Sequence, residues 1–388
     1  MSQVSAPAAP SPDPMAGAGG TRPRVAVVFG GRSGEHAISC VTAAGVLGAI
    51  DRGRYDVVPV GITRSGRWVL VEGDPAALGI VDGRLPEVPA DGVVVALAQE
   101  VGSRELQPVA GDRAPHDLGT VDVVLPLLHG PYGEDGTLQG LLELSDTRYV
   151  GSGVLASAAS MDKQVMKVLL TGAGLPVGPH TSFTRRRWER REQECRAEVE
   201  ALGWPVFVKP ARAGSSIGIS RVERPEDLAA AVAQAQRHDP KVVVEAAITG
   251  REIECGVLEA LDGGDPLTSL PGEVAVVDGR SFYDFEAKYL VADEAVRLSC
   301  PADLPAELTR RVRETAARVF EALGAEGLAR VDLFVCDDGR IYVNEINTMP
   351  GFTPTSMFPR MWAATGVDYP DLVDHLLQLA LRRPVGLR

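Results

Sequence analysis

The sequence contains few cysteines, and their arrangement argues against two common kinds of stabilising site. Only five of the 388 residues are cysteine, an odd number, and no two of them form a Cys-x-x-Cys pair. Disulfide frameworks and tetrahedral zinc sites need paired or closely spaced cysteines. We therefore expect reduced thiols and a cytoplasmic location.

Long apolar runs and an excess of positive charge are also missing. No uninterrupted apolar stretch approaches the roughly 18 residues that a membrane-spanning helix needs. The formal net charge of -13 provides no basic surface to attract nucleic acid or anionic lipid. The sequence therefore predicts neither a membrane segment nor a nucleic-acid partner.

Three widespread nucleotide-binding motifs are absent as well. A glycine-rich turn, Gly30–Gly34, follows a strand predicted at Arg24–Phe29, but it lacks the GxGxxG spacing of dinucleotide-binding folds. A second small-residue loop, Ala213–Gly218, lacks the GK[ST] ending of a Walker A loop. The HRD and DFG motifs of protein kinases are both absent. Any nucleotide site in this chain must be built differently.

The most informative stretch that is present runs from Gly327 to Gly351. An Asp-Gly pair, Asp338 and Gly339, separates two apolar runs, which is a strong signal for a β-hairpin. A two-residue loop at this pair predicts four pairs on one face of the ribbon. They are Arg330 with Asn347, Asp332 with Glu345, Phe334 with Val343, and Cys336 with Ile341.

This pairing places two carboxylates directly opposite each other, which destabilises an antiparallel pair of strands. A bound cation would remove the repulsion, and the oxygen ligands of Asp332, Glu345 and Asn347 suit Mg²⁺. An ordinary hairpin with its acidic side chains in water is the alternative. The other face of the first strand favours a site, because it is apolar throughout (Ala329, Val331, Leu333 and Val335).

Two polar residues follow predicted strands in the N-terminal part. Glu35 comes after the glycine-rich turn, where it can meet a small polar ligand or simply stabilise the first turn of a predicted helix. His129 directly follows a strand predicted at 121–128. Ligands of open α/β sheets bind at this carboxyl end of the strands. A hydrogen bond within its own loop is the alternative role for this histidine.

Lysines lie in three separate segments. They are Lys163 and Lys167 on a predicted helix, Lys209 at the end of a predicted strand, and Lys288 in an aromatic loop. The loop Ala213–Gly218 can wrap backbone N–H groups around phosphate oxygens, although a plain hairpin loop is the alternative. Together with the metal-binding hairpin, these features describe a site for a nucleoside triphosphate.

At this level of detail the chain resembles the D-alanine–D-alanine ligases of the ATP-grasp superfamily. Five motifs occur in the family's order, namely HGPYGEDGTLQG, GSGVLASAASMDK, VFVKPARAGSSIG, FYDFEAKYL and RVDLFV…NEINTMPG. The match runs from about Arg24 to Ala380. It implies an α/β fold, α+β in the ATP-binding part, in which an ATP-grasp unit follows an N-terminal Rossmann-like parallel sheet.

The domain division that we expect has four parts. Residues 1–22 form a disordered tail and residues 23–150 an N-terminal substrate domain. Residues 151–241 form the central ATP-grasp subdomain, and residues 242–384 the C-terminal ATP-grasp and catalytic domain. The resemblance also implies a homodimer.

The activity implied by the resemblance is synthesis of D-alanyl-D-alanine for peptidoglycan precursors. ATP phosphorylates the carboxylate of a first D-alanine, and the amine of a second D-alanine attacks the acyl phosphate. Two Mg²⁺ ions assist, and Mn²⁺ is an alternative metal. A ligase that takes D-lactate as its second substrate and a non-catalytic nucleotide-binding regulator are the other hypotheses.

The resemblance assigns roles by motif position. For ATP they fall on Lys163, Lys209, Ser216, Glu245, Glu252 and Lys288, and for the metals on Asp332, Glu345 and Asn347. Glu35 and His129 would bind the first D-alanine, and Ser356 the carboxylate of the second. Arg330 and the Gly351 N–H would stabilise the tetrahedral oxyanion. Glu35, Ser215 and Tyr289 would hold the active-site loop closed, and Tyr289 favours the dipeptide product.

Overall fold

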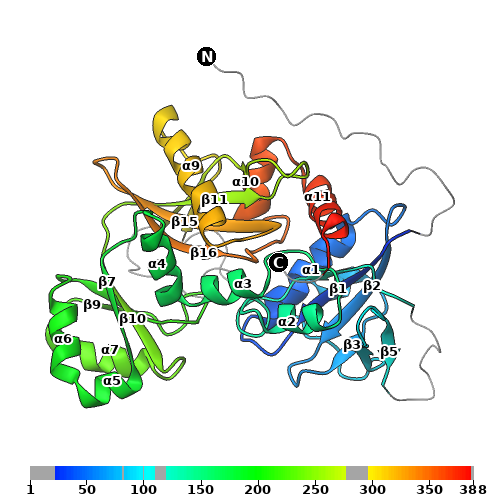
Figure 1. Ribbon diagram of the computed structural model, residues 1–388, viewed down its shortest axis with the longest axis horizontal. Helices are drawn as coiled ribbons and strands as arrows, with labels where there is room; N and C mark the ends of the chain where they lie inside the picture. Colours follow the sequence, from blue (N-terminus) through cyan, green and yellow to red (C-terminus); the bar gives the residue numbers. More distant parts are fainter. Residues whose placement is uncertain (1–21, 81–82, 99, 110–118, 277–295, 386–388) are drawn as a thin grey trace.

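The computed structural model describes residues 22–80, 83–98, 100–109, 119–276 and 296–385 (Figure 1). Two expected site residues, Lys288 and Tyr289, lie outside the described residues. The remaining chain forms three principal sheets, each with its own helices. Among the described residues, no helix combines the length and apolarity that crossing a membrane requires.

The N-terminal part is an α/β unit around a four-stranded sheet of order β3-β2-β1-β6. Strand β1 pairs in parallel with both β2 and β6, while β3 is an antiparallel edge strand. The elements are β1 (Arg24–Gly30), α1 (His36–Ala49), β2 (Asp56–Ile62), β3 (Trp68–Leu70), η1 (Pro75–Leu78), β4 (Val95–Leu97), β5 (Leu106–Pro108), β6 (Val123–Pro126) and α2 (Thr137–Leu144).

Strand β1 is covered on both faces, which explains its uninterrupted apolar sequence. Val25, Val27 and Phe29 pack in the same core as α1, whereas Ala26 and Val28 pack in a second core that includes residues of α2. The predicted parallel sheet and the helix after the glycine-rich turn are thus confirmed.

Two short helices and a small antiparallel sheet follow. The sheet has the order β7-β10-β8-β9, and a core shared with α6 and α7 covers one of its faces. The elements are α3 (Val154–Met161), α4 (Lys163–Gly172), β7 (His180–Thr184), α5 (Arg185–Arg190), α6 (Glu192–Glu200), β8 (Val206–Pro210), β9 (Ser220–Val222), η2 (Pro225–Asp227), α7 (Leu228–Ala235) and β10 (Lys241–Ala246). We call the sheet β7-β10-β8-β9 the small sheet.

The large sheet is antiparallel and has the order β14-β13-β11-β15-β16, with β12 paired to β11. The elements of this part are β11 (Arg251–Leu258), β12 (Leu267–Thr268), β13 (Gly272–Val276), β14 (Val296–Ser299), α9 (Ala306–Ala322), β15 (Leu328–Val335), β16 (Ile341–Asn347), α10 (Met357–Thr365) and α11 (Tyr369–Arg382). Helices α4 and α9 share a core with β11, β15 and β16.

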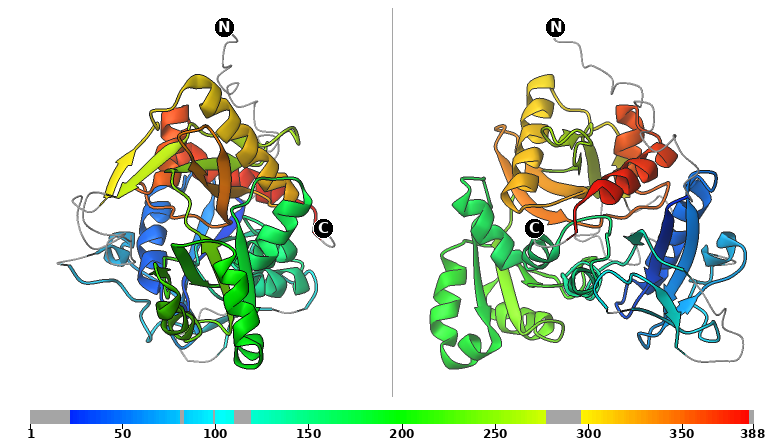
Figure 2. Two further views of the ribbon diagram at one scale, coloured as in Figure 1. Left: turned by 90° about the vertical axis from the view of Figure 1, so that its left-hand side faces the viewer. Right: turned by 45° about the vertical axis from the view of Figure 1, so that its right-hand side comes forward.

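The C-terminal helices return to the N-terminal sheet. Figure 2 shows α11 beside α1 and the N-terminal strands. Helix α11 contacts both α1 and β6. Phe358 and Trp362 of α10 and Leu376 of α11 share a core with Val27 and Phe29 of β1. This packing brings the end of the hairpin β15–β16 against the loops that follow β1 and β6.

The predicted hairpin is present, but its register differs near the turn. The pairs Arg330–Asn347 and Asp332–Glu345 are confirmed, whereas Phe334 faces Tyr342 and Val335 faces Ile341. The predicted partners of Phe334 and Cys336 were therefore wrong.

Two irregularities explain the difference. Cys336 N donates to Arg340 O at 2.9 Å, so the loop has three residues and ends at Gly339, whose φ is +79°. A bulge at Asn344 then adds one residue to β16 and restores the predicted register at Asp332. The two shifts cancel at the positions of the polar residues, Arg330 and Asp332.

Candidate active site

Two adjoining cavities lie where the three parts of the fold meet. One, about 280 Å³, lies between the small and large sheets, and we call it the nucleotide cavity after the site expected from the sequence. The other, about 330 Å³, lies between the N-terminal loops and the end of the hairpin, and we call it the substrate cavity on the same basis. Both are lined by Gly214, Ser215, Glu254, Val274, Arg330 and Glu345. A group transferred from one cavity to the other would pass these residues.

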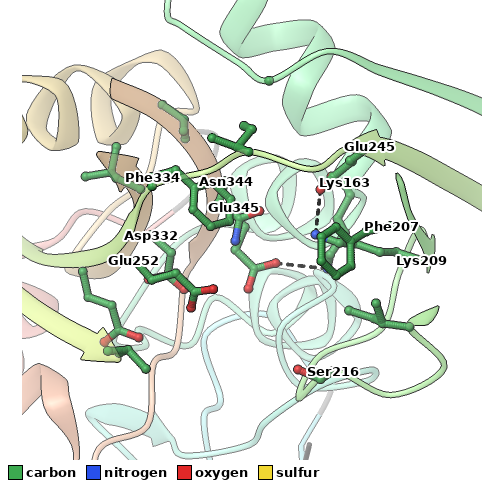
Figure 3. Close-up of a pocket in the computed structure, with 18 of the residues that line it drawn as sticks. Lys163, Phe207, Lys209, Ser216, Glu245, Glu252, Asp332, Phe334, Asn344 and Glu345 are labelled. Atoms are coloured by element: carbon green, nitrogen blue, oxygen red, sulfur yellow. Dashed lines mark hydrogen bonds and ion pairs between the residues drawn. The ribbon is translucent and has the colours of Figure 1, made fainter. Parts of the chain in front are cut away.

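On one side of the nucleotide cavity, Glu245 lies beside Lys209 (Figure 3). Lys209 on β8 donates to Glu245 Oε2 at 2.6 Å, and Lys167 Nζ on α4 lies 3.0 Å from Glu245 Oε1. Burial by itself would raise the pKa of Glu245, but the two lysines hold that pKa well below its usual range. Glu245 is therefore ionised.

Lys163 connects the small-residue loop, Ala213–Gly218, to the hairpin β15–β16. It begins α4, where the Asp162 side chain accepts a hydrogen bond from Val165 N at 3.2 Å. Its Nζ donates to Ala213 O at 3.0 Å and lies 3.2 Å from Glu345 Oε2. The loop joins β8 to β9, so it is a hairpin loop that also lines both cavities.

The opposite side of the nucleotide cavity is acidic. The strand register places Glu254 of β11 opposite Asp332 of β15, and Asp332 opposite Glu345 of β16. The side chains of Glu252, Asp332 and Glu345 lie across the cavity from Lys209 and Phe207 in Figure 3. Three carboxylates in one row repel each other unless cations separate them.

Arg330 supplies the main compensation for this acidic row. Its Nε and Nη2 each donate to Asp332 at 2.7 Å, and its Nε lies 3.3 Å from Glu254 Oε2. Burial by itself would lower the pKa of Arg330, but Asp332 and Glu254 raise it well above the ordinary value. Its guanidinium is therefore a permanent, oriented cation at the junction of the cavities.

The three expected metal ligands lie together. Asn347 Nδ2 donates to Asp332 Oδ2 at 3.0 Å, and Asp332 and Glu345 are paired across the strands. Within the described ranges, no group of three or more His, Cys, Asp or Glu side chains forms a candidate metal site. Two carboxylates and an amide nevertheless fit Mg²⁺, which commonly takes one or two carboxylates and completes its shell with phosphate oxygens and water.

The substrate cavity is enclosed by loops from distant parts of the sequence. Glu35 is only 8% exposed and accepts a hydrogen bond from Ser215 Oγ, instead of capping α1. Gly130 has a φ of +75°, and a Cβ there would lie 2.5 Å from Glu35 Oε2. Glycine is therefore required where this loop meets Glu35.

His129 is buried beside the end of the hairpin. Its Nδ1 lies 3.2 Å from Met349 O, and its Nε2 lies 3.4 Å from Thr42 Oγ1. Burial lowers the pKa of His129, so the neutral form is favoured. Both contacts go to distant segments and not to the loop of His129 itself, which was the alternative, and His129 also lines the substrate cavity.

Gly351 and Ser356 complete this cavity. Both line it, and Ser356 Oγ accepts a hydrogen bond from Thr353 N at 3.1 Å just before α10. Ser216 and Glu252 line the nucleotide cavity. The structure thus brings together every expected site residue that it describes.

Several residues that line the cavities were not expected from the sequence. They are Phe207, Glu254 and Asn344 in the nucleotide cavity and Glu134 in the substrate cavity. Lys167, which the sequence grouped with Lys163 without a role of its own, also lines the nucleotide cavity, because the four-residue spacing places both on one helix face. The position of Glu254 beside Asp332 depends on the pairing of β11 with β15, which local sequence does not reveal.

Comparison with protein families identifies the chain. Residues 24–152 match the family model for the D-ala D-ala ligase N-terminus, and residues 169–378 match the model for the C-terminus. The chain belongs to the D-alanine–D-alanine ligase family. Together the two matches include the residues that line both cavities, apart from Lys163 and Lys167, which lie between the matched ranges.

Relatives within the D-alanine–D-alanine ligase family are similar over nearly their whole length. A D-alanine–D-alanine ligase of Kineococcus radiotolerans is 73% identical over 374 residues, which cover 95% of this chain and 99% of the relative. One of Streptomyces avermitilis is 52% identical over 397 residues and covers 100% of both chains.

Solved structures agree with this assignment. The VanG D-Ala:D-Ser ligase of Enterococcus faecalis has a TM-score of 0.80 at 34% identity, and the match covers 93% of this chain and 100% of that chain. The D-alanine–D-alanine ligase of Coxiella burnetii has a TM-score of 0.74 at 31% identity, covering 93% and 94%. The ATP-grasp fold expected from the sequence is confirmed.

Proposed function

We propose that this chain joins two D-alanine molecules into D-alanyl-D-alanine, with ATP converted to ADP and phosphate, for peptidoglycan precursor synthesis. Family membership supports the reaction class. The observation that carries the proposal is the shared wall of the two cavities, where Ser215, Arg330 and Glu345 border both. A phosphoryl donor in one cavity and a carboxylate acceptor in the other would meet there.

The nucleotide cavity is the proposed ATP site. Lys163, Lys209 and Ser216 would face the phosphates, together with Lys288. Glu245 and Glu252 would hold the adenosine, since Glu245 is kept as an ionised hydrogen-bond acceptor by its two lysines. Cations and N–H donors that are already in place lower the electrostatic cost of bringing a polyanion into a partly enclosed site.

Asp332, Glu345 and Asn347 are the proposed ligands for two Mg²⁺ ions, with Mn²⁺ as an alternative. When bound, such ions neutralise charge on the phosphates and on the transferred group. Arg330 and Lys163 now compensate these carboxylates. Both cations lie against the proposed metal ligands, where they would face the phosphate oxygens of a bound nucleotide.

The substrate cavity is the proposed site for both D-alanine molecules. Glu35 would pair with the ammonium group of the first D-alanine, and the neutral His129 would lie beside it. Arg330 and the Gly351 N–H would stabilise the oxyanion that forms when the second amine attacks. Ser356 would bind the carboxylate of the second D-alanine, and Tyr289 would favour an amine over a hydroxyl as nucleophile.

Exclusion of water is the other requirement, because an acyl phosphate hydrolyses readily. The hydrogen bond from Ser215 to Glu35 joins the small sheet's loop to the N-terminal part. This contact supports closure of the loop over the reacting groups, with Tyr289 as the expected third member.

Product analysis tests the proposal. The protein is incubated with ATP and Mg²⁺ and with D-alanine alone, or with D-lactate or D-serine added, and products are identified by mass spectrometry. We expect D-alanyl-D-alanine as the main product, with one ADP per dipeptide. A dominant D-lactate ester would favour the depsipeptide hypothesis. Binding of ATP without any product would favour the non-catalytic regulator.

The remaining expectations are also proposals. The cytoplasm is the compartment that supplies ATP, and none of the described helices is suited to cross a membrane. A homodimer and the division at residues 150 and 241 follow from the resemblance to the family. Light scattering at micromolar concentration tests the dimer, and limited proteolysis tests the division.

A further inference from the structure

Lys167 is a buried lysine in the nucleotide cavity to which no role has yet been assigned. It lies on α4, one turn after Lys163, and is only 2% exposed. Its Nζ lies 3.0 Å from Glu245 Oε1 on β10 and donates to Asn344 O on β16 at 3.2 Å. The ammonium group therefore connects α4 to one strand of each sheet, β10 of the small sheet and β16 of the large sheet.

The bulge in β16 provides one of these contacts. Asn344 is the extra residue between Val343 and Glu345, so it has no partner on β15. A residue inserted in this way is left out of the regular pairing, and its carbonyl is available for another donor. Lys167 is that donor, and the contact restricts where its ammonium group can lie.

Glu245 is held by two lysines that differ in freedom. Lys209 donates to Oε2 and ends a strand beside the small-residue loop, where phosphate binding would attract it. Lys167 is anchored by the Asn344 carbonyl and almost fully buried. A buried carboxylate without a neighbouring cation is strongly destabilised in its charged form. If Lys209 turned to a phosphate, Lys167 would remain beside Glu245 and keep its charged form stable.

We propose that Lys167 is a positioning residue that keeps Glu245 ionised and aimed into the nucleotide cavity, and that it thereby sets the preference for adenine nucleotides. The carboxylate accepts a hydrogen bond from the exocyclic amine of adenine. Guanine carries a carbonyl oxygen at the same ring position, which a fixed carboxylate repels. The inference rests on the proposed function to the extent that the cavity must hold ATP.

The variant Lys167→Met tests the inference, because it keeps the length of the side chain and removes its charge. Dissociation constants for ADP and GDP are measured by calorimetry, and KM and kcat are measured with ATP and GTP. We expect the ADP dissociation constant and the KM for ATP to rise roughly 10- to 100-fold, as for loss of a charge-assisted hydrogen bond. We expect kcat at saturating ATP to change much less, and the preference for adenine to fall.

Two further variants define the controls. Arg187→Met removes another helical cation, on α5, which pairs with Glu198 and does not line the nucleotide cavity. We expect it to leave nucleotide affinity and base preference unchanged. Lys167→Arg keeps the positive charge and should restore part of the affinity. If Lys167→Met does not fold, Lys167→Gln replaces it, since the amide can still donate to the Asn344 carbonyl.

A double-mutant cycle separates positioning from a purely structural role. In Glu245→Gln the neutral amide no longer needs a cation, so adding Lys167→Met should weaken ADP binding far less than it does in the wild type. Additive effects of the two substitutions, or unchanged affinity and base preference in Lys167→Met, would overturn the inference.

Binding measured by calorimetry requires no catalytic turnover. A wild-type protein that binds ADP but makes no dipeptide would therefore refute the proposed function and leave this test intact.

Discussion

The two sheets that enclose the nucleotide cavity position their polar groups by different structural means. The small sheet contributes Lys209 and a hairpin loop of small residues, whose Ser215 and Ser216 both have positive φ. The large sheet contributes a row of carboxylates at consecutive paired positions on β11, β15 and β16. Helix α4 lies between them and directs Lys163 and Lys167 toward carboxylates on both sheets.

This difference suggests a division of labour between binding and chemistry. A loop can close over a nucleotide and reopen, whereas residues on paired strands are held at fixed separations. Groups that must be placed precisely around the reacting phosphate therefore lie on the large sheet. Groups that would capture and release the nucleotide lie on the loop between β8 and β9.

The largest effect is expected for Arg330→Ala on the large sheet. Because Arg330 is the proposed oxyanion stabiliser, kcat should fall roughly a hundredfold or more while ADP affinity stays nearly unchanged. Steady-state kinetics and calorimetry measure the two quantities.

Arg340→Ala is the matched control for this experiment, because Arg340 is an exposed arginine on the same hairpin. We expect wild-type kinetics from it. An Arg330→Ala protein that lost nucleotide affinity and kept its kcat would break the division of labour between the sheets.

A smaller effect is expected for Asp332→Asn, which should increase the Mg²⁺ concentration that the enzyme needs. The variant removes a charged oxygen ligand, so the Mg²⁺ concentration for half-maximal rate should rise roughly tenfold or more. ADP binding measured in the presence of EDTA should stay within a few-fold of wild type. Asp338→Asn, at the exposed hairpin turn, is the control. Equal Mg²⁺ dependence in the two variants would remove Asp332 from the metal site.

A moderate effect on stability is expected at Glu134, where the N-terminal loops meet the large sheet. Burial raises the pKa of Glu134 to about 8, and the Glu35 carboxylate adds to the rise. The backbone N–H groups of Gly130 and Met349, at 2.5 and 3.3 Å, and the nearby Arg330 act in the opposite direction.

The direction of the pH effect follows from this pKa. Glu134 is protonated in the folded protein and ionised in the unfolded chain between about pH 4.5 and 8. Its contribution to stability is therefore complete below pH 4.5 and is lost as the pH rises to about 8. Glu134→Gln should gain melting temperature relative to wild type, by a few degrees, between pH 5.5 and pH 8.5. Parallel melting curves at all pH values would contradict the assignment.

The smallest effect is a difference in thiol reactivity between the two sheets. Cys195 lies in the core of the small sheet and Cys255 in that of the large sheet, and burial raises the pKa of Cys255 to about 12. Peptide mapping after alkylation should show Cys336, near the hairpin turn, labelled first. If the small sheet opens more readily, Cys195 should react before Cys255. The reverse order would assign the greater mobility to the large sheet.

Local sequence was sufficient for much of the site. The Asp-Gly turn and the alternating pattern of β15 predicted the hairpin and its buried face, whereas the predicted pairing of Asp332 with Glu345 is correct only because the three-residue turn and the bulge shift the register in opposite directions. Motif order predicted the fold and the residues that line both cavities. These predictions succeeded because strand alternation and turn preferences are short-range properties of the chain.

Other features depended on pairing between distant strands. The bulge at Asn344 and the three-residue turn shift the register twice, and no turn or alternation rule located the bulge. The approach of Glu254 to Arg330 requires β11 beside β15, about 75 residues away along the chain. Long-range pairings of this kind are selected by the whole core and not by local preference.

By itself, then, the sequence determined the family, the hairpin and the identity of most polar residues in the cavities. Only the tertiary structure decided how their charges are balanced. The acidic pair on the hairpin was expected to need a bound cation, yet Arg330 and Lys163 already lie against it. Lysines and carboxylates from the two sheets and α4 neutralise one another only after these elements pack together, because Coulomb interactions depend on separation in space and not along the chain.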